Sequence, residues 1–198
     1  RYDALSINIG GGPFKRMPVH DTGLPVKPIG RFIEAWESLL ERTRDHRGFQ
    51  LAIVGGGPGI SASCAKLFSR NGMKAAIAAR NIDKPVLLQL AEEFDVARYT
   101  CDAADPASVA ALFAAVKSDL GTPKLVVHNI DGRVRDIFGK TITEADPDLA
   151  LQTMKNGAFS AFLVAQQAAT QMLVVEPDEK GLRGTILFTN ASAANKGY

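Results

Sequence analysis

The stretch Val54-Gly55-Gly56-Gly57-Pro58-Gly59-Ile60-Ser61 decides how the rest of this chain is interpreted. It follows an apolar run at residues 49–54, typical of a buried strand, and it opens a segment at residues 60–71 with helical periodicity. Glycines lack the Cβ atoms that would hold a ligand away from the backbone, and a helix N-terminus offers unpaired N–H groups and a positive dipole end. The stretch therefore predicts a strand-to-helix turn that can bind a pyrophosphate; a tight turn without a ligand has the same composition.

Two glycine patterns fit this turn in part. The pattern Gly-x-Gly-x-x-Gly of flavin- and NAD-binding folds fits Gly55 and Gly57 but meets Ile60 at its third glycine. A longer pattern of glycine, three residues, glycine, isoleucine and glycine fits Gly55, Gly59 and Ile60, with Ser61 at its last glycine. The turn alone leaves both patterns open, so residues further along the chain must decide between them.

Composition limits the class of protein. With 198 residues, of which 46% are hydrophobic, the chain can bury one sizeable core. The net charge of +2 is too small to indicate nucleic acid binding, and no apolar run approaches the roughly 20 residues that cross a bilayer. The two cysteines, Cys64 and Cys101, fall in core-like segments, and we expect both to be reduced in a cytoplasmic protein. No metal site is expected.

The first 48 residues differ in pattern from the rest. Residues 10–30 are rich in glycine and proline and predict an irregular arm, and residues 32–44 predict an amphipathic helix. From residue 49 onward, strand-like and helix-like segments alternate. We therefore expect an N-terminal arm and helix over residues 1–48 and a dinucleotide-binding domain over residues 49–198.

The alternation predicts the fold. Strand-like segments lie at 50–54, 74–79, 96–100, 124–129 and 184–189, and helix-like segments lie at 60–71, 84–94, 106–119 and 147–173. Asp105 and Pro106 suit the start of the third of these helices, and Gly121 suits its end. Short apolar strands joined by helices imply an α/β protein with a doubly wound parallel sheet and helices on both faces, the Rossmann fold.

The end of the second predicted strand bears on the nucleotide. Ala79-Arg80-Asn81 stands where an NAD or FAD site usually has a carboxylate for the ribose hydroxyls. A carboxylate repels a 2′-phosphate, whereas a guanidinium pairs with it in a bidentate manner. Arg80 therefore favours NADP over NAD and FAD, the alternative being an ordinary solvent-exposed arginine at a strand end.

From about residue 49 to its end, the chain resembles the short-chain dehydrogenase/reductase family, in which the glycine turn follows the longer pattern. In Cys101-Asp102-Ala103, Asp102 is similar to the family's aspartate that meets the adenine amino group. In His128-Asn129-Ile130-Asp131, Asn129 matches the family's Asn-Asn-Ala-Gly and is implied to bind backbone groups and steady the central sheet. His128 and Asp131 depart from that pattern, and we expect His128 to be structural. The resemblance implies cofactor contacts by Gly55, Gly57, Gly59, Ile60, Ser61, Arg80, Asp102 and Asn129.

Two residues further on are implied by the same resemblance to be catalytic. Asn156 lies within the segment 147–173, where an Asn-Gly pair is unfavourable for a helix. In the family such an asparagine bends the helix, and its backbone holds a water in a proton relay. Ser192 follows the last predicted strand and is similar to the family's serine that donates a hydrogen bond to the substrate carbonyl.

The family's catalytic tyrosine, with a lysine four positions after it, is absent from the chain as given. That tyrosine should lie about a dozen residues beyond Ser192, whereas the sequence stops at Tyr198. We therefore expect a C-terminally incomplete, NADP-dependent oxidoreductase that transfers a hydride between NADPH and a small carbonyl or alcohol substrate. The resemblance also implies a homo-oligomer, a dimer or a tetramer. A non-catalytic nucleotide-binding or scaffold member of the family is the main alternative, and an FAD-binding protein is a third.

Overall fold

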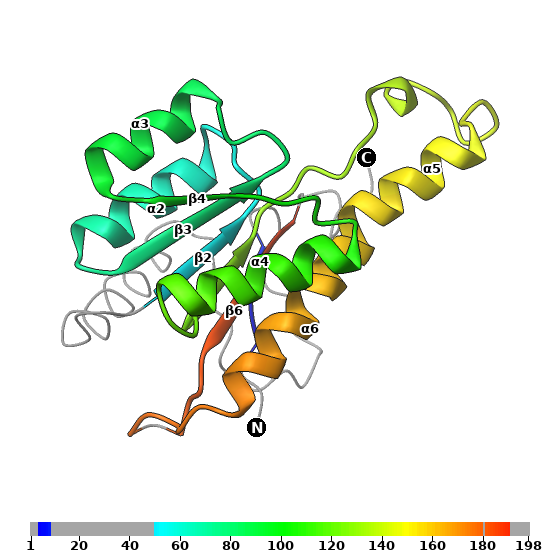
Figure 1. Cartoon of the computed structure of the whole chain (residues 1–198). Coiled ribbons are helices and arrows are strands. Elements are labelled where there is room, and N and C mark those ends of the chain that lie inside the picture. The colour runs from blue at the N-terminus through cyan, green and yellow to red at the C-terminus, as the bar shows by residue number, and fades with distance from the viewer. Residues whose placement is uncertain (1–3, 9–49, 180, 191–198) are drawn as a thin grey trace.

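The computed structural model describes residues 4–8, 50–179 and 181–190 and shows six strands joined by helices (Figure 1). The strands are β1 (Ala4–Asn8), β2 (Gln50–Val54), β3 (Lys74–Ala79), β4 (Ala97–Thr100), β5 (Leu125–His128) and β6 (Thr185–Asn190). The α-helices are α2 (Ile60–Arg70), α3 (Pro85–Phe94), α4 (Pro106–Asp119), α5 (Pro147–Met154) and α6 (Ser160–Leu173). A short 3₁₀ helix spans Arg135–Ile137, and a π-helix spans Lys155–Phe159.

The strands form one parallel sheet in the order β1-β6-β5-β2-β3-β4. Five of them match the strands predicted from sequence, with ends that differ by a residue at most. The strand β1 was not predicted, and it lies in the segment assigned to an N-terminal arm. It pairs along its whole length with β6 at one edge of the sheet. The predicted helix at residues 32–44 lies outside the described residues.

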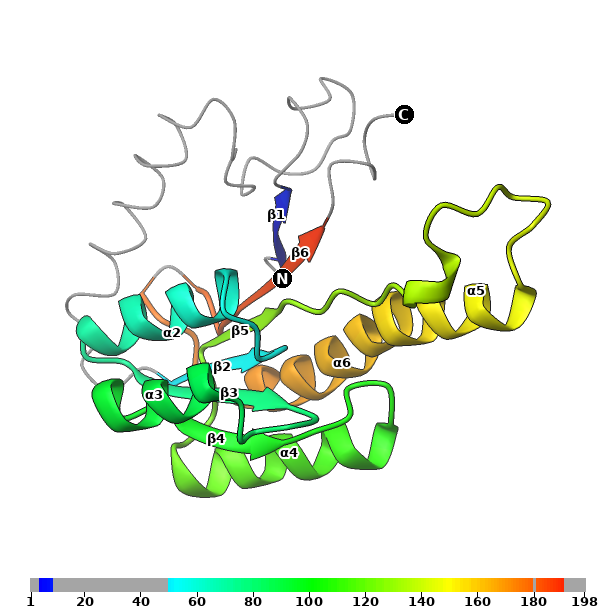
Figure 2. The same cartoon turned by 90° about the horizontal axis from the view of Figure 1, so that it is seen from above.

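Helices cover both faces of the sheet, as the continuous apolar run of β2 requires. Leu51 and Ile53 of β2 pack into one core with α2 and α3, while Ala52 and Val54 pack into a second core with α4 and α6. Side chains that alternate along a strand point to opposite faces, so one strand serves both layers. The fold is the predicted doubly wound parallel α/β sheet, and the two helical layers are visible on its opposite sides (Figure 2).

The long predicted helix at 147–173 is one continuous helical run with a π-helix in its middle. The helix α5 and the loop before it project away from the sheet (Figures 1 and 2), whereas α6 packs on it through buried Leu163, Val164 and Ala168. The interruption coincides with the pair Asn156-Gly157. An extra residue in the turn shifts the hydrogen-bond ladder, and such π turns are frequent at functional sites.

Both cysteines belong to the described residues. Cys64 is half-buried, Cys101 is buried, and neither forms a disulfide. Burial raises the pKa of both thiols, so both are poor nucleophiles. Among the described residues, no helix has the length and apolar character that crossing a bilayer demands.

Candidate nucleotide site

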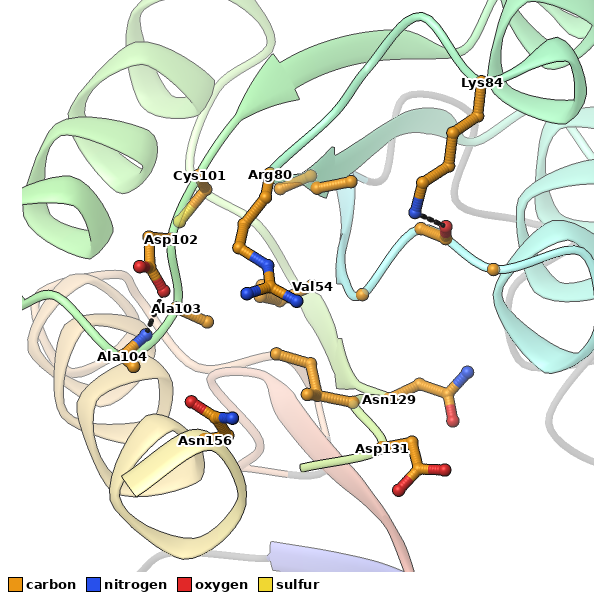
Figure 3. A pocket seen from close by; sticks show the side chains of 16 residues that line it. Val54, Arg80, Lys84, Cys101, Asp102, Ala103, Ala104, Asn129, Asp131 and Asn156 are labelled. Carbon is orange, nitrogen blue, oxygen red and sulfur yellow. Dashed lines mark hydrogen bonds between the residues drawn. The ribbon is translucent and has the colours of Figure 1, made fainter. Parts of the chain in front are cut away.

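A cleft of about 360 Å³ opens at the carboxyl ends of the strands, beside β2 (Figure 3). Here the strand order changes direction, because β3 lies on one side of β2 and β5 on the other. Such a switch point is where open α/β sheets bind ligands. The cleft brings together six of the residues predicted from sequence, namely Gly55, Gly57, Arg80, Asp102, Asn129 and Asn156.

The glycine turn forms the floor of this cleft, and its glycines serve different purposes. Gly55 has φ +116°, and a Cβ there would lie 2.1 Å from the carbonyl oxygen of Asn129. A Cβ on Gly56 would lie 2.9 Å from the Cβ of Ala79. Gly57 and Gly59, in contrast, have open space where a Cβ would stand. The fold therefore demands the first two glycines, while the openness at the other two leaves the backbone accessible to a ligand.

The start of α2 leaves amides unused. The N–H groups of Ala62 and Ser63 donate to the carbonyls of Gly57 and Gly59. Within the described part of the chain, no hydrogen bond takes up the N–H groups of Gly59, Ile60 or Ser61. Unpaired amides at a helix N-terminus are an anion-binding feature. These three residues do not themselves line the described cleft; Ile60 lines a neighbouring hollow instead.

Ser61 has a role that sequence reasoning missed. The resemblance implied that Ser61 contacts the cofactor, yet its side chain is fully buried and donates to the carbonyl of Gly55. Asn129 Nδ2 in turn donates to Ser61 Oγ at 2.8 Å. The serine therefore links the glycine turn to β5.

Asn129 joins three elements at the centre of the site. Besides its bond to Ser61, its Oδ1 accepts from Thr189 Oγ1 of β6 at 2.7 Å, and its backbone N–H donates to Val54 of β2. The resemblance implied backbone partners for Asn129, whereas its side chain bonds the hydroxyl groups of Ser61 and Thr189. One amide thereby holds α2, β5 and β6 in register at the cleft.

Two cations line the cleft near the end of β3. The guanidinium of Arg80 points into the cleft (Figure 3), and within the described residues it has no ion-pair or hydrogen-bond partner. Lys84, at the N-cap of α3, donates from Nζ to the carbonyl of Gly56 at 3.2 Å. Lys84 is not among the residues predicted from sequence. The one local feature that could have indicated Lys84 is its position, directly before Pro85 and four residues after Arg80.

Asp102 stands on the opposite wall, after β4. Its Oδ1 accepts from the N–H of Ala104 at 3.0 Å, and its own N–H donates to Ser108 Oγ of α4. These bonds fix the loop and hold the carboxylate at the cleft, where it can accept hydrogen bonds from a base.

The π-helix brings Asn156 to the same cleft. Gln152 Nε2 donates to Asn156 Oδ1 at 2.6 Å, which fixes the amide orientation. The backbone of Gly132 lies so close that a Cβ there would stand 2.5 Å from the backbone nitrogen of Gly157. This close approach of two glycines lets the loop after β5 cross the π-helix. Asn156 thus faces Arg80 and Asp102, while Gly157 lines the neighbouring hollow.

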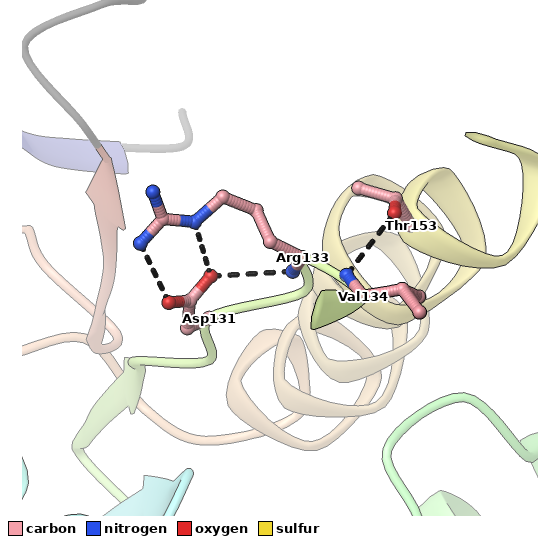
Figure 4. A network of polar contacts seen from close by, with 4 residues as sticks. All are labelled: Asp131, Arg133, Val134 and Thr153. Atoms are coloured by element: carbon pink, nitrogen blue, oxygen red, sulfur yellow. Dashed lines mark hydrogen bonds and ion pairs between the residues drawn. The ribbon is translucent and has the colours of Figure 1, made fainter. Parts of the chain in front are cut away.

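That hollow, of about 580 Å³, adjoins the cleft and shares Asn129, Ile130 and Asp131 with it. Asp131 forms a bidentate ion pair with Arg133 at 2.8 and 2.7 Å (Figure 4), and the arginine lowers the pKa of the carboxyl. The guanidinium also lies 4.9 Å from the ring centroid of Phe138. Thr153 Oγ1 accepts from the N–H of Val134 and ties this loop to α5. The hollow is therefore bordered by a charged pair that is already satisfied.

His128 is buried at the end of β5 and bonded to the helix beside it. It is 4% exposed, and its Nε2 lies 2.9 Å from Ser160 Oγ. The hydroxyl donates to the carbonyl of Asn156 at 2.5 Å, so the imidazole is joined to the π-helix through Ser160. Burial lowers the pKa of His128 from 6.5 to about 4, which keeps the ring neutral near pH 7.

The family model described as enoyl-(acyl carrier protein) reductase matches residues 55–198, the greater part of the chain, beginning at the first glycine of the cleft. The chain belongs to the short-chain dehydrogenase/reductase family. No curated protein matches the chain. Asp102 and Asn129 line the same cleft as the glycine turn. Ser192 and Tyr198 lie outside the described residues.

Solved structures of short-chain dehydrogenases share the fold. A short-chain type dehydrogenase/reductase from Mycobacterium marinum is 22% identical, with a TM-score of 0.68 over 80% of this chain. An NADH-dependent reductase complexed with NAD is 19% identical, with a TM-score of 0.67 over 78% of the chain. A variant of actinorhodin polyketide ketoreductase with NADPH is 24% identical, with a TM-score of 0.65 over 79%. The chain spans 62%, 64% and 57% of these three proteins, respectively.

Proposed function

We propose that this chain is the nucleotide-binding part of an NADP-dependent short-chain oxidoreductase that acts on a small carbonyl or alcohol substrate. The observation that carries the proposal is Arg80, a cation without a protein partner in the described residues that points into the cleft beside the glycine turn. An acidic residue at this place would select ribose hydroxyls, whereas a guanidinium is suited to a 2′-phosphate. Similar folds have been solved with NAD and with NADPH, which supports a nicotinamide nucleotide in general.

The cleft and the adjoining start of α2 together offer the donors and acceptors that such a nucleotide needs. In the proposal, the open backbone at Gly57 and the unpaired amides at the start of α2 hold the pyrophosphate. Asp102 accepts from the adenine amino group, and Arg80 pairs with the 2′-phosphate. The bound nicotinamide would supply or accept a hydride.

The hollow next to the cleft is the proposed place of the substrate. It is lined mainly by apolar and small side chains, including Ile60, Ala158, Ala161 and Phe188, and a carbonyl compound would lie against the nucleotide where hollow and cleft share residues. Ser192 is proposed to donate a hydrogen bond to the substrate carbonyl. Asn156 is proposed to hold a relay water at its backbone oxygen. A carbonyl oxygen has two lone pairs, so the bond from Ser160 leaves one of them for that water.

Oligomerisation is part of the proposal. The continuous helix formed by α5, the π-helix and α6 exposes Leu151, Met154, Phe159 and Phe162, which are 64%, 64%, 40% and 56% exposed. Large apolar side chains rarely gather on a free surface. Sedimentation of the chain should show a dimer or a tetramer, and a strict monomer at micromolar concentration would contradict this part.

One observation favours a second candidate, a nucleotide-binding protein without catalysis. Within the described residues, the titratable groups that line the hollow are His128, which is held neutral, and the satisfied pair of Asp131 and Arg133. None of them is suited to hand a proton to a substrate. Nucleotide binding without turnover over a panel of carbonyl compounds would select this candidate.

The test of the main proposal is coenzyme binding, measured by fluorescence titration with NADPH and NADH. The unaltered chain should bind NADPH at least about tenfold more tightly, a difference of about 1.4 kcal/mol. Arg80→Met should remove most of that preference, while Arg135→Met, an exposed arginine on the 3₁₀ helix outside the cleft, should keep it. Equal affinity for both coenzymes in the unaltered chain would refute NADP dependence, and absence of both binding and NADPH-dependent turnover would refute the proposed function.

A further inference from the structure

Lys84 stands at the junction of two parts of the cleft. It is the N-cap of α3, yet its side chain reaches back to the glycine turn, where Nζ donates to the carbonyl of Gly56 (Figure 3). At 3.2 Å this bond is at the long end of the normal range. An ammonium group has three donors, and the described bond uses one. Two donors of Lys84 therefore remain for a ligand in the cleft that Arg80 also lines.

The turn between these two cations contains one carboxylate, that of Asp83, and this carboxylate faces Arg98 and pairs with neither cation. Asp83 lies between Arg80 and Lys84 in sequence, but its Oδ1 lies 3.7 Å from Nη1 of Arg98 on β4. The same Nη1 of Arg98 donates to the carbonyl of Ile82 at 2.7 Å, so it holds the turn through two contacts. The N–H of Asp83 is further fixed by Asn81 Oδ1 at 2.9 Å.

The other carboxylates that line the cleft do not neutralise the two cations. Asp131 is paired with Arg133, and Asp102 accepts from the backbone of Ala104. Within the described residues, the ion pairs involve neither Arg80 nor Lys84. The end of the cleft next to β3 therefore presents two positive charges without an internal counter-ion, which is the pattern of an anion subsite.

We propose that Lys84 is the second cation of the 2′-phosphate subsite and acts with Arg80 to select NADP over NAD. This inference rests on the proposed function and adds a specificity-determining residue to it. A 2′-phosphate is a monoester with a charge near −2 and three acceptor oxygens, more than one guanidinium fork can satisfy. Arg80 supplies a planar bidentate donor, and Lys84 supplies a mobile point charge from the other side of the turn.

The nearest competing role for Lys84 is contact with the pyrophosphate, because its present partner belongs to the glycine turn. That turn already offers the free amides at the start of α2 to the pyrophosphate. Among the described residues that line the cleft, Lys84 is the one cationic side chain besides Arg80, so it is the available second cation for a dianionic 2′-phosphate. The two roles differ in one measurable respect, since both coenzymes have the pyrophosphate but only NADP has the 2′-phosphate.

The experiment compares the dissociation constants of NADPH and NADH for Lys84→Met, Lys84→Arg and Lys117→Met. Lys117 is an exposed lysine in the last turn of α4 and outside the cleft, so it is the charge-matched control. We expect Lys84→Met to raise the dissociation constant of NADPH by about tenfold and that of NADH by less than about threefold. Both Lys84→Arg and Lys117→Met should bind the two coenzymes about as tightly as the unaltered chain does. Adenosine 2′,5′-bisphosphate should lose affinity for Lys84→Met in the same way, and adenosine 5′-diphosphate should not.

Equal weakening of NADPH and NADH would place Lys84 on the pyrophosphate or the glycine turn and overturn the inference. Unchanged dissociation constants for both coenzymes would also overturn the inference. If the unaltered chain prefers NADPH and Lys84→Met keeps that preference, this inference alone fails. If the unaltered chain has no NADPH preference, the NADP dependence proposed above fails together with it.

Discussion

Replacing Gly55 by alanine tests the central claim about the glycine turn, namely that its first glycine is demanded by the fold rather than by the ligand. Gly55 has φ +116°, a conformation that alanine adopts only with strain. The new Cβ would also stand 2.1 Å from the carbonyl oxygen and 2.7 Å from the carbonyl carbon of Asn129. Both atoms are backbone of β5's continuation and cannot turn aside as a side-chain end could.

The expected loss of stability follows from these two penalties. A residue held in a sparsely populated backbone region costs about 1 to 3 kcal/mol, and overpacking against a well-packed neighbour costs about as much again. The free energy of unfolding should therefore fall by about 2 to 6 kcal/mol, a large part of the roughly 5 to 15 kcal/mol typical of a domain. With a urea m-value of about 2 to 3 kcal/mol per molar, the midpoint should fall by about 0.7 to 3 M.

The assay is urea unfolding followed by circular dichroism, with Gly57→Ala as the matched control. Gly57 has open space at its Cβ position and belongs to the same turn, so its alanine variant should unfold within about 1 kcal/mol of the unaltered chain. The Gly57→Ala variant should also bind NADPH more weakly, because its methyl group enters the cleft that Gly57 lines. A loss below about 1 kcal/mol in Gly55→Ala, or equal losses in both variants, would refute the reasoning.

Three further predictions concern the residues that hold the cleft together. Asn129→Leu removes the side-chain bonds to Ser61 and Thr189 and should lower the free energy of unfolding by about 1 to 3 kcal/mol, measured by urea titration. Burial lowers the pKa of His128 to about 4, so the unfolded chain binds the proton first as the pH falls. Its contribution is constant above about pH 6.5, and up to about 3 kcal/mol is lost between there and pH 4, a loss that His128→Asn should remove from the pH profile of unfolding. Gly132→Ala would place a Cβ 2.5 Å from the backbone of the π-helix and should speed amide hydrogen exchange there.

Each of these predictions has an outcome that contradicts it. An Asn129→Leu variant as stable as the unaltered chain would mean that the amide bonds contribute nothing. A pH profile that keeps its acid slope after His128→Asn would assign that slope to other groups. Unchanged exchange in the π-helix of Gly132→Ala would show that the loop after β5 can retreat without cost.

Much of the fold follows from local sequence. The helix predicted at residues 106–119 is observed with the same bounds, because Asp105 caps it through the amides of Ala107 and Ser108. The buried strands β2 and β3 also match, since short apolar runs between turn residues are typical of a central parallel sheet. The edge strand β1 was missed although residues 5–8 alternate between apolar and polar, because so short a run is a weak signal and its partner β6 lies far along the chain.

The sequence indicated which residues line the cleft better than it indicated the contacts that these residues make. Its residue type at a strand end indicated Arg80, and the resemblance to the short-chain family implied Asp102 and Asn129. The three line one cleft because the carboxyl ends of parallel strands meet at one edge of the sheet. The sequence did not indicate that Lys84 reaches the glycine turn, 28 residues away. Nor did it indicate that Ser61 is buried against Asn129, 68 residues away.

The sequence by itself determined the order of strands and helices and the place of the glycine turn, since periodicity and glycine content act over neighbouring residues. Only the tertiary structure decided which of these glycines the fold requires. Gly55 faces the backbone of Asn129, while Gly57 faces open space. The amino-acid sequence of the turn does not distinguish these two glycines. The physical reason is that steric contact and hydrogen bonding between strands depend on which elements the sheet places side by side, and that pairing is not encoded in any single local stretch.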